Sequence, residues 1–255
     1  MRRIFPLAIF VMALLTGDCV RAQSANPLAA PTPPNRFGAD IGLNINQQSG
    51  SFNSDCGCEF PSGAGTGFFV SGIAEMHLNQ TVALMAKLSI NNITLTSKAL
   101  TSKPQTVVLP DGIVDSSSII DMNETAVTRL TYLQITPMVR YDVFKRFFVA
   151  FGPSVGIAIG NGQSVDESVA KAGYGFWPDG STTRTLHASS DPVASLSAIR
   201  FSLVGTLGYE FDITPKWSFV PTASVDFPLT NVTSGSTWKI MSFQIAGGVR
   251  WKVHV

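Results

Sequence analysis

The chain has 255 residues, which leaves room for one large domain or two small ones. Only 14% of the residues are charged, whereas soluble domains average about 25%, and glycine and phenylalanine are abundant at 22 and 17 residues. The formal net charge of +1 excludes the strongly basic chains that bind nucleic acid, so no nucleic-acid partner is expected. This composition indicates a surface that is partly in contact with a solvent other than water.

The first 22 residues have the organisation of a secretory signal peptide. Arg2 and Arg3 precede an apolar run at residues 4–15, and a small-x-small triplet ends at Ala22. The run is shorter than the about 20 residues that a membrane-spanning helix needs. The alternatives are an uncleaved anchor and lipidation at Cys19, but Asp18 stands where a lipidation signal has a small residue.

Three segments follow from this reading. We expect residues 1–22 to be removed as a signal peptide and residues 23–35, rich in Pro and Ala, to form a flexible periplasmic segment. Residues 36–255 are expected to form a single domain in the bacterial outer membrane.

Strict alternation of apolar and polar residues dominates this domain. In the last stretch Phe243, Ile245 and Val249 share one face, while Gln244 and Arg250 occupy the other. A helix would place Arg250 among apolar residues, so the period of two indicates a strand. Eight stretches follow this rule: 37–45, 68–78, 82–91, 133–143, 147–159, 199–210, 217–227 and 241–255. Pro137, Pro153 and Pro221 fall inside three of them, where bulges or strand ends are expected.

The connections between these stretches alternate in length. Short turns are expected at 79–81, 144–146 and 212–216, and long loops at 47–66, 94–128, 161–193 and 230–236. Outer-membrane barrels have short periplasmic turns and longer extracellular loops. The expected fold is therefore all-β, an eight-stranded antiparallel up-and-down transmembrane β-barrel with outer-membrane lipids around it.

Aromatic residues gather at the short-turn side, as expected for a girdle at the lipid headgroups. They are Phe37, Tyr141, Phe147, Tyr209, Phe211, Trp217, Phe219 and Trp251. A soluble sandwich or lipocalin-like barrel also has alternating strands, but it places its apolar residues inside. The signal peptide, the low charge and the girdle favour the membrane barrel.

Several stretches also resemble a known family. They are FGADIGLN, CGCEFPSGAGTGFFVSGIAEMHL, LQITPMVRYDVFKRFFVAFGPSVGIAIG, GTLGYEFDITPKWSFVPTASVDFPLTNV and the closing strand to Val255. In these stretches the chain resembles the PorT-like outer-membrane β-barrel proteins, a branch of the OmpA-type eight-stranded barrels. The resemblance implies a fold and a location more firmly than an activity.

The inward face of the expected barrel carries charges of both signs. They are Asp40, Glu75, Lys87, Arg140, Asp142, Arg200, Glu210, Asp226, Arg250 and Lys252. An eight-stranded barrel is just wide enough for side chains to fill, and buried charges must pair. We expect an ion-pair network that plugs the lumen, centred on Glu75, Lys87, Arg140, Asp226 and Arg250. The alternative is a charged pore for small solutes.

No catalytic site is expected. The histidines are His77, His187 and His254, and the group formed by His187 with Ser189, Ser190 and Asp191 has ordinary loop composition. The sequence shows no phosphate loop and no metal-spaced cluster, so neither a cofactor nor a metal is expected. Cys56 and Cys58 have a C-x-C spacing that allows a small strained ring or a pair between chains.

The long loops are the expected functional surface. Phe176, Trp177 and Pro178 either anchor a partner or fold over the barrel mouth. The expected role is non-enzymatic, either structural, adhesive or accessory to secretion, with envelope or extracellular protein partners contacting the loops. A solute-diffusion channel and, less favoured, a membrane-embedded hydrolase are the alternatives.

Overall fold

The structure, a computed structural model, describes residues 33–53, 58–116, 119–144, 146–176 and 178–253. The expected signal peptide and most of the segment 23–35 therefore lie outside the described residues, as do Cys19, Cys56, Trp177 and His254. The elements in the described ranges are β-strands. Nothing in these ranges forms a helix long and apolar enough to cross a membrane.

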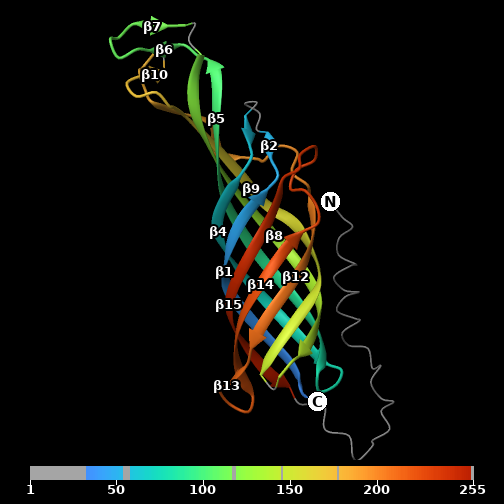
Figure 1. Ribbon diagram of the computed structural model, residues 1–255. Helices are drawn as coiled ribbons and strands as arrows, with labels where there is room; N and C mark the ends of the chain where they lie inside the picture. The colour runs from blue at the N-terminus through green and yellow to red at the C-terminus, as the bar shows by residue number, and fades with distance from the viewer. Residues whose placement is uncertain (1–32, 54–57, 117–118, 145, 177, 254–255) are drawn as a thin grey trace, which may run out of the picture. The chain divides into compact units, whose positions relative to one another are not determined.

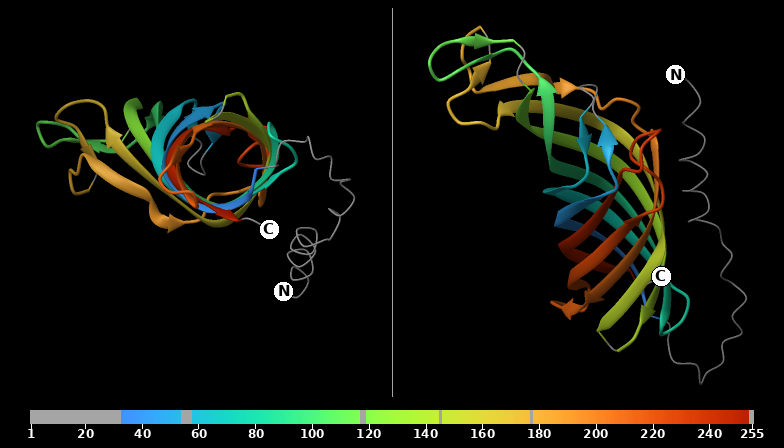
Figure 2. Two further views of the ribbon diagram at one scale, coloured as in Figure 1. Left: turned by 90° about the horizontal axis from the view of Figure 1, so that it is seen from below. Right: turned by 45° about the horizontal axis from the view of Figure 1, so that its top comes forward.

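Eight long strands form one closed ring (Figures 1 and 2). They are β1 (Asn35–Ser49), β4 (Gly63–His77), β5 (Val82–Pro104), β8 (Ile119–Asp142), β9 (Phe147–Val169), β12 (Ile199–Tyr209), β14 (Trp217–Pro228) and β15 (Lys239–Val253). Each is antiparallel to both neighbours, and β1 closes the ring against β15 from Asn35 opposite Val253 to Ser49 opposite Lys239. The predicted eight-stranded antiparallel barrel is confirmed.

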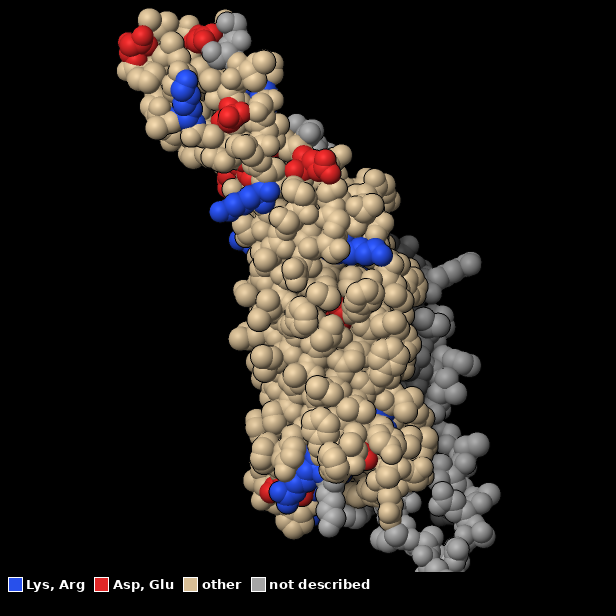
Figure 3. Space-filling view, in the orientation of Figure 1, with Lys and Arg blue, Asp and Glu red and all other residues tan. Residues whose placement is uncertain are grey.

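Alternation decides which side chains point into the barrel. On β1, Ile41 and Leu43 are 67% and 69% exposed, whereas Asp40 and Asn44 are buried. Soluble barrels bury their apolar side chains, but around this ring the large aliphatic and aromatic side chains are on the outside. Figure 3 shows the middle of the wall almost without Lys, Arg, Asp or Glu, which gather toward the two ends. Such an outer wall is suited to hydrocarbon rather than water.

Short turns at one end of the barrel join β4 to β5, β8 to β9 and β12 to β14, as predicted. The turn after β12 contains β13 (Phe211–Asp212), which pairs with β14. At this short-turn end Trp217 stacks on Trp251 with ring centroids 6.2 Å apart, and Tyr209 and Phe211 lie 4.7 Å apart. These outward-facing rings form part of the predicted girdle.

The opposite, long-loop end differs from the prediction in one respect. Residues 94–104, 119–128 and 161–169 were expected in loops, but they continue β5, β8 and β9 as strands. β5 and β8 remain paired to Pro104 opposite Ile119, far beyond the last pair between β4 and β5, Gly63 with Ser97. Polar residues such as Thr96 and Lys98 now stand among the outward positions, so the apolar alternation is interrupted while the backbone ladder continues.

We call this continuation the extension: residues 98–104 of β5, 119–125 of β8, 163–169 of β9, and β11 (Thr183–Asp191), which pairs with β9. Figure 1 shows it projecting past the ring. The shorter strands at this end are β2 (Phe52–Asn53), β3 (Glu59–Phe60), β6 (Val107–Val108), β7 (Val114–Asp115) and β10 (Gly175–Phe176). β2 pairs with β3, and β6 pairs with both β7 and β10.

The prolines do not act as predicted. Pro137, Pro153 and Pro221 lie inside β8, β9 and β14, and no register shift occurs at any of them. The β8–β9 ladder shifts instead between Thr131 and Tyr132, where Gly160 and Ala158 are the partners. The extra residue on β9 changes which positions face inward, so Val165 and Glu167 are buried.

Candidate functional site

A cluster of ion pairs fills the lumen near the short-turn end. Glu75 lies at its centre: its carboxylate accepts hydrogen bonds from Arg140 Nη1 at 2.8 Å and from Arg250 Nε at 3.2 Å. Arg250 also binds Asp40, with Nη1 2.5 Å from Oδ1. These four residues come from β4, β8, β15 and β1, so the pairs tie together four walls of the barrel.

Further charges complete this lumen ion cluster, which comprises Arg36, Asp40, Glu75, Arg140, Asp142, Glu210 and Arg250. Arg140 lies 3.1 Å from Glu210 and 2.7 Å from Asp142, and Arg36 binds Glu210. The guanidinium carbon of Arg140 lies 3.9 Å from the centre of the Phe148 ring. Arg36 was not among the predicted residues. Every second residue of β1 points inward, so Arg36 lies on the same face as Gly38 and Asp40.

The structure brings together three of the five predicted site residues and separates the other two. Asp226 binds Arg200 instead, with contacts of 3.1 and 3.2 Å. Within the described part of the chain Lys87 has no ion-pair partner, and its Nζ lies 4.4 Å from the centre of the Phe69 ring. The predicted single network is thus two clusters, because strand register sets Asp226 at a different depth from Glu75.

A chain of polar side chains crosses the middle of the lumen. Asn44 donates to Asn91 at 2.6 Å, Asn91 donates to Gln134 at 2.9 Å, and Gln134 donates to Asp226 at 3.3 Å. On the other side of Asn44, Asn46 donates to it at 2.8 Å. Because each of these amides hydrogen-bonds to the next side chain, the polar groups are buried in the lumen with hydrogen-bond partners.

An apolar layer closes the lumen at the long-loop end. We call it the mouth plug: Phe52, Cys58, Phe60, Ile93, Leu95, Ala126, Leu130, Tyr132, Val165, Val193, Val232, Trp238 and Ile240. The ring of Phe52 stacks between Phe60 and Trp238, with centroids 5.0 and 4.3 Å away. Phe52, Phe60 and Trp238 come from loop segments that turn inward over the barrel.

Between these layers the lumen contains small cavities. One is lined by Lys87, Asp40 and Arg250, another by Lys87, Asp226 and Gln244, and each has a volume of about 10 Å³. Each cavity is large enough for about one water molecule.

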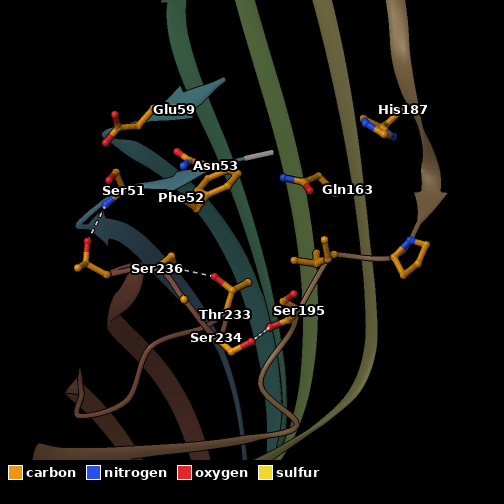
Figure 4. A pocket seen from close by; sticks show the side chains of 15 residues that line it. Ser51, Phe52, Asn53, Glu59, Gln163, His187, Ser195, Thr233, Ser234 and Ser236 are labelled. Atoms are coloured by element: carbon orange, nitrogen blue, oxygen red, sulfur yellow. Dashed lines mark hydrogen bonds between the residues drawn. The ribbon is translucent and has the colours of Figure 1, made fainter. Parts of the chain in front are cut away.

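Outside the mouth plug the loops form a much larger hollow, the mouth pocket. Its volume is about 570 Å³ (Figure 4). It is lined by Ser51, Phe52, Asn53, Glu59, Gln163, His187, Pro192, Val193, Ala194, Ser195, Thr233, Ser234, Gly235, Ser236 and Thr237. The walls thus come from the β1–β4 loop, β9, β11 with its following loop, and the β14–β15 loop.

The extension carries its own buried ion cluster, which loop prediction missed. Lys103 binds both Glu124, at 3.1 Å, and Glu167, and Arg184 Nε donates to Glu167 at 2.6 Å. Burial alone lowers the pKa of Lys103, but its hydrogen bonds to the two carboxylates outweigh burial and raise the pKa above its ordinary value. The signal that could have revealed it is that residues 93–103 continue to alternate between inward and outward positions, although many of these residues are small or polar.

Apolar side chains pack beside this ion cluster. Val107, Ile120, Met122 and Phe176 are buried together, and the guanidinium carbon of Arg184 lies 4.3 Å from the centre of the Phe176 ring. Phe176 was expected to anchor a partner or cover the barrel mouth. It does neither here, because β10 pairs with β6 and buries its ring in the extension.

The histidines occupy different surroundings. His77 is buried at the last residue of β4, at the short-turn end of the barrel. His187 lines the mouth pocket. The side chains of Ser189, Ser190 and Asp191 lie outside the described part. Cys58 is buried in the mouth plug. No group of three or more His, Cys, Asp or Glu side chains able to hold a metal occurs within the described ranges.

Comparison with known proteins addresses the fold. No curated protein matches the chain. Ail, the attachment invasion locus protein of Yersinia pestis, is 9% identical, with a TM-score of 0.32 over 86% of this chain and 99% of that chain. The outer membrane protein AlkL is 9% identical, with a TM-score of 0.36 over 89% of this chain and 95% of that chain. The outer membrane protease OmpT of Escherichia coli is 10% identical, with a TM-score of 0.28 over 89% of this chain and 99% of that chain. Similarity at this level says nothing about activity.

A family model gives the decisive match. The model of the outer membrane protein beta-barrel domain matches residues 22–234, which is more than half of the chain. The match agrees with the closed ring of eight strands and with its apolar outer wall. The chain therefore belongs to the outer membrane protein β-barrel domain family, and its barrel spans the bacterial outer membrane in contact with lipid.

Proposed function

We propose that this protein is a closed, non-enzymatic barrel that holds a binding surface outside the cell, in an adhesive role. In the outer membrane, short turns face the periplasm and long loops face the exterior. The extension and the mouth pocket then lie on the outside, available to envelope or extracellular protein partners. The finer resemblance to PorT-like proteins, with a structural or secretion-accessory role, belongs to the same proposal.

The observation that carries the proposal is the closure of the lumen at successive depths. The lumen ion cluster, the chain of amides around Asn91 and the mouth plug follow one another from the short-turn end to the long-loop end. Breaking a buried ion pair is costly, because it leaves an uncompensated charge. Opening a path for solutes would require breaking the ion pairs, separating the hydrogen-bonded amides and displacing the mouth plug.

The extension supports the binding role. It continues the β5–β8 ladder in unbroken register, and Lys103, Glu124 and Glu167 tie its inner face together. Loops held on such a rigid sheet present a fixed surface at little entropic cost.

Conductance tests the proposal directly. The full chain, refolded and reconstituted into planar bilayers beside a general porin as the positive control, is expected to show no steady channel current. Steady and large conductance would contradict a closed barrel and would indicate the solute-diffusion channel instead.

The absence of an enzymatic role is also part of the proposal. A catalytic histidine must bond both a nucleophile and an orienting group. Neither ring nitrogen of His77 has a hydrogen-bond partner among the described residues. Incubation of the reconstituted protein with phospholipid and with fluorogenic peptides is expected to yield no product. Turnover that disappears in His187→Ala would establish a hydrolase.

A further inference from the structure

The mouth pocket has the size of a small-molecule site. Its volume of about 570 Å³ lies within the range of about 300 to 1,000 Å³ that is usual for ligand pockets. Figure 4 shows Glu59 and Asn53 on one side of the pocket and His187 and Gln163 on the other. The lumen cavities hold only a water molecule each, so this pocket is the larger space by far.

The lining indicates the charge of the ligand. Among the described residues that line the pocket there is no lysine and no arginine, and Glu59 is the one carboxylate. Anions are recognised by cationic side chains, above all by bidentate arginine. A phosphorylated, sulfated or carboxylated ligand would meet no lysine or arginine among the described lining residues and would be repelled by Glu59.

The lining is instead rich in neutral hydrogen-bonding groups. Hydroxyls come from Ser51, Ser195, Thr233, Ser234, Ser236 and Thr237, and amides from Asn53 and Gln163. Hydroxyls both donate and accept, and an amide offers one group of each kind. Such a set is complementary to a ligand that carries many hydroxyls of its own.

The base of the pocket is apolar. Phe52 and Val193 belong to both the mouth plug and the pocket lining. Because Phe60 and Trp238 stack on the two faces of the Phe52 ring, the edge of this ring borders the pocket. A sugar ring has C–H groups on its faces and hydroxyls around its edge, so an apolar base with a hydroxyl-rich wall fits it on both counts.

Hydrogen bonds between the β14–β15 loop and the loop that follows β11 hold this wall of the pocket in place. Ser195 has φ of +54°, a conformation that non-glycine residues rarely adopt. Its carbonyl accepts from Ser234 N at 2.9 Å and from Ser234 Oγ at 3.3 Å. Strained backbone of this kind is concentrated at ligand sites, where the surrounding contacts must maintain it.

We propose that the mouth pocket binds a neutral saccharide of one or two rings. The inference rests on the proposed function, because it assigns a ligand class to the exposed binding surface. The apolar base contacts one face of the ring, and the serine, threonine and amide groups bind its hydroxyls.

The test uses the full chain refolded in a detergent without a sugar headgroup, such as LDAO. Saturation-transfer NMR and titration calorimetry are run with maltose, lactose and diacetylchitobiose, and with a sulfated heparin disaccharide as the charged probe. At least one neutral probe is expected to bind and the sulfated one is not. Failure of all three neutral probes at millimolar concentration, or binding of the sulfated probe alone, overturns the proposal.

Two variants locate the binding. Ala194→Trp places an indole in the pocket and is expected to weaken binding by about tenfold or more. Ala170→Trp, at an exposed position at the end of β9, is the matched control and is expected to leave binding unchanged. Asn53→Leu removes a polar group without filling the space, and heat-dependent gel migration checks that each variant folds.

Unchanged binding in Ala194→Trp would also overturn the proposal. The outcome is separable from that of the conductance experiment. If the barrel conducts and still binds a neutral saccharide, only the closed lumen is refuted. If the barrel shows no channel current and binds no neutral probe, only the saccharide site is refuted.

Discussion

Glu75 and Arg250 meet across the lumen at 3.2 Å, although β1 lies between their strands in the wall. Since Glu75 also binds Arg140 at 2.8 Å, a single carboxylate is shared by two buried guanidinium groups. Without Glu75, Arg140 would keep Asp142 and Glu210 and Arg250 would keep Asp40, but no carboxylate would stand between the two guanidinium groups.

Replacing this carboxylate is therefore expected to destabilise the barrel strongly. Glu75→Gln removes the carboxylate that Arg140 and Arg250 share, and breaking a buried pair costs about 3–5 kcal/mol. Urea unfolding in detergent micelles measures the loss. Glu59→Gln, at an exposed carboxylate, is the control and should stay within about 0.5 kcal/mol of wild type. A loss below about 1 kcal/mol for Glu75→Gln would show that the cluster does not hold the wall.

Gly248 is required by the same cluster. A Cβ at this position would lie 1.8 Å from Asp40 Oδ1 and 2.7 Å from Arg250 Nη1. Gly248→Ala is expected to displace the Asp40–Arg250 pair and to cost about 1–3 kcal/mol, the usual range for overpacking. Gly72→Ala is the matched control, since nothing lies within 4 Å of its Cβ position, and it should be neutral or slightly stabilising. Equal effects of the two substitutions would contradict this explanation.

The tryptophans report how the barrel sits in the bilayer. Trp217 and Trp251 are 46% and 45% exposed on the outer wall near the short turns, whereas Trp238 is buried in the mouth plug. Among variants that each retain a single tryptophan, those with Trp217 or Trp251 should be quenched most by labels near the headgroups. The Trp238 variant should be quenched little at any depth. Stronger quenching of Trp217 by labels at the bilayer centre would refute the proposed girdle.

Lys103 gives a pH dependence with a defined sign. Its pKa is raised, so the stabilisation that it contributes is complete below its ordinary value of 10.5 and is lost as the pH rises through the raised value. The ¹³C NMR titration of Lys103 should therefore have its midpoint above 10.5 in wild type. Glu167→Gln should move the midpoint downward, because it removes one of the two carboxylates. A midpoint that stays unchanged in this variant would exclude the pairing.

At the short-turn end Lys252 and Asp212 form an ion pair that is more exposed than the pairs in the lumen. Lys252 donates to Asp212, and this hydrogen bond is the main cause of the lowered pKa of Asp212. A lowered pKa contributes stability above the ordinary value of 3.8, and this is lost as the pH falls through the lowered value. Because Asp212 is largely exposed, Asp212→Asn is expected to cost less than about 1 kcal/mol at neutral pH in urea unfolding. A larger loss would mean that the pair is shielded from water.

Much of the barrel follows from the sequence because side chains on a strand alternate with a period of two. That rule placed Ile41, Leu43 and Trp251 outside and Asp40, Glu75 and Arg140 inside, and the turn lengths gave the up-and-down order. The ends of β5, β8 and β9 were misjudged for the same reason. Once Thr96 and Lys98 replace apolar residues on the outer face, alternation no longer signals the strand, although the hydrogen-bonded ladder continues.

By itself, then, the sequence determined which face of each strand meets lipid, how many strands there are, and that charges of both signs share the lumen. Only the tertiary structure decided which charges pair, because depth in the barrel depends on the register between strands. Register separates Asp226 from Glu75 and leaves Lys87 beside Phe69. It also brings four separate segments together around the mouth pocket, which no local pattern encodes, since the contacts join residues distant along the chain.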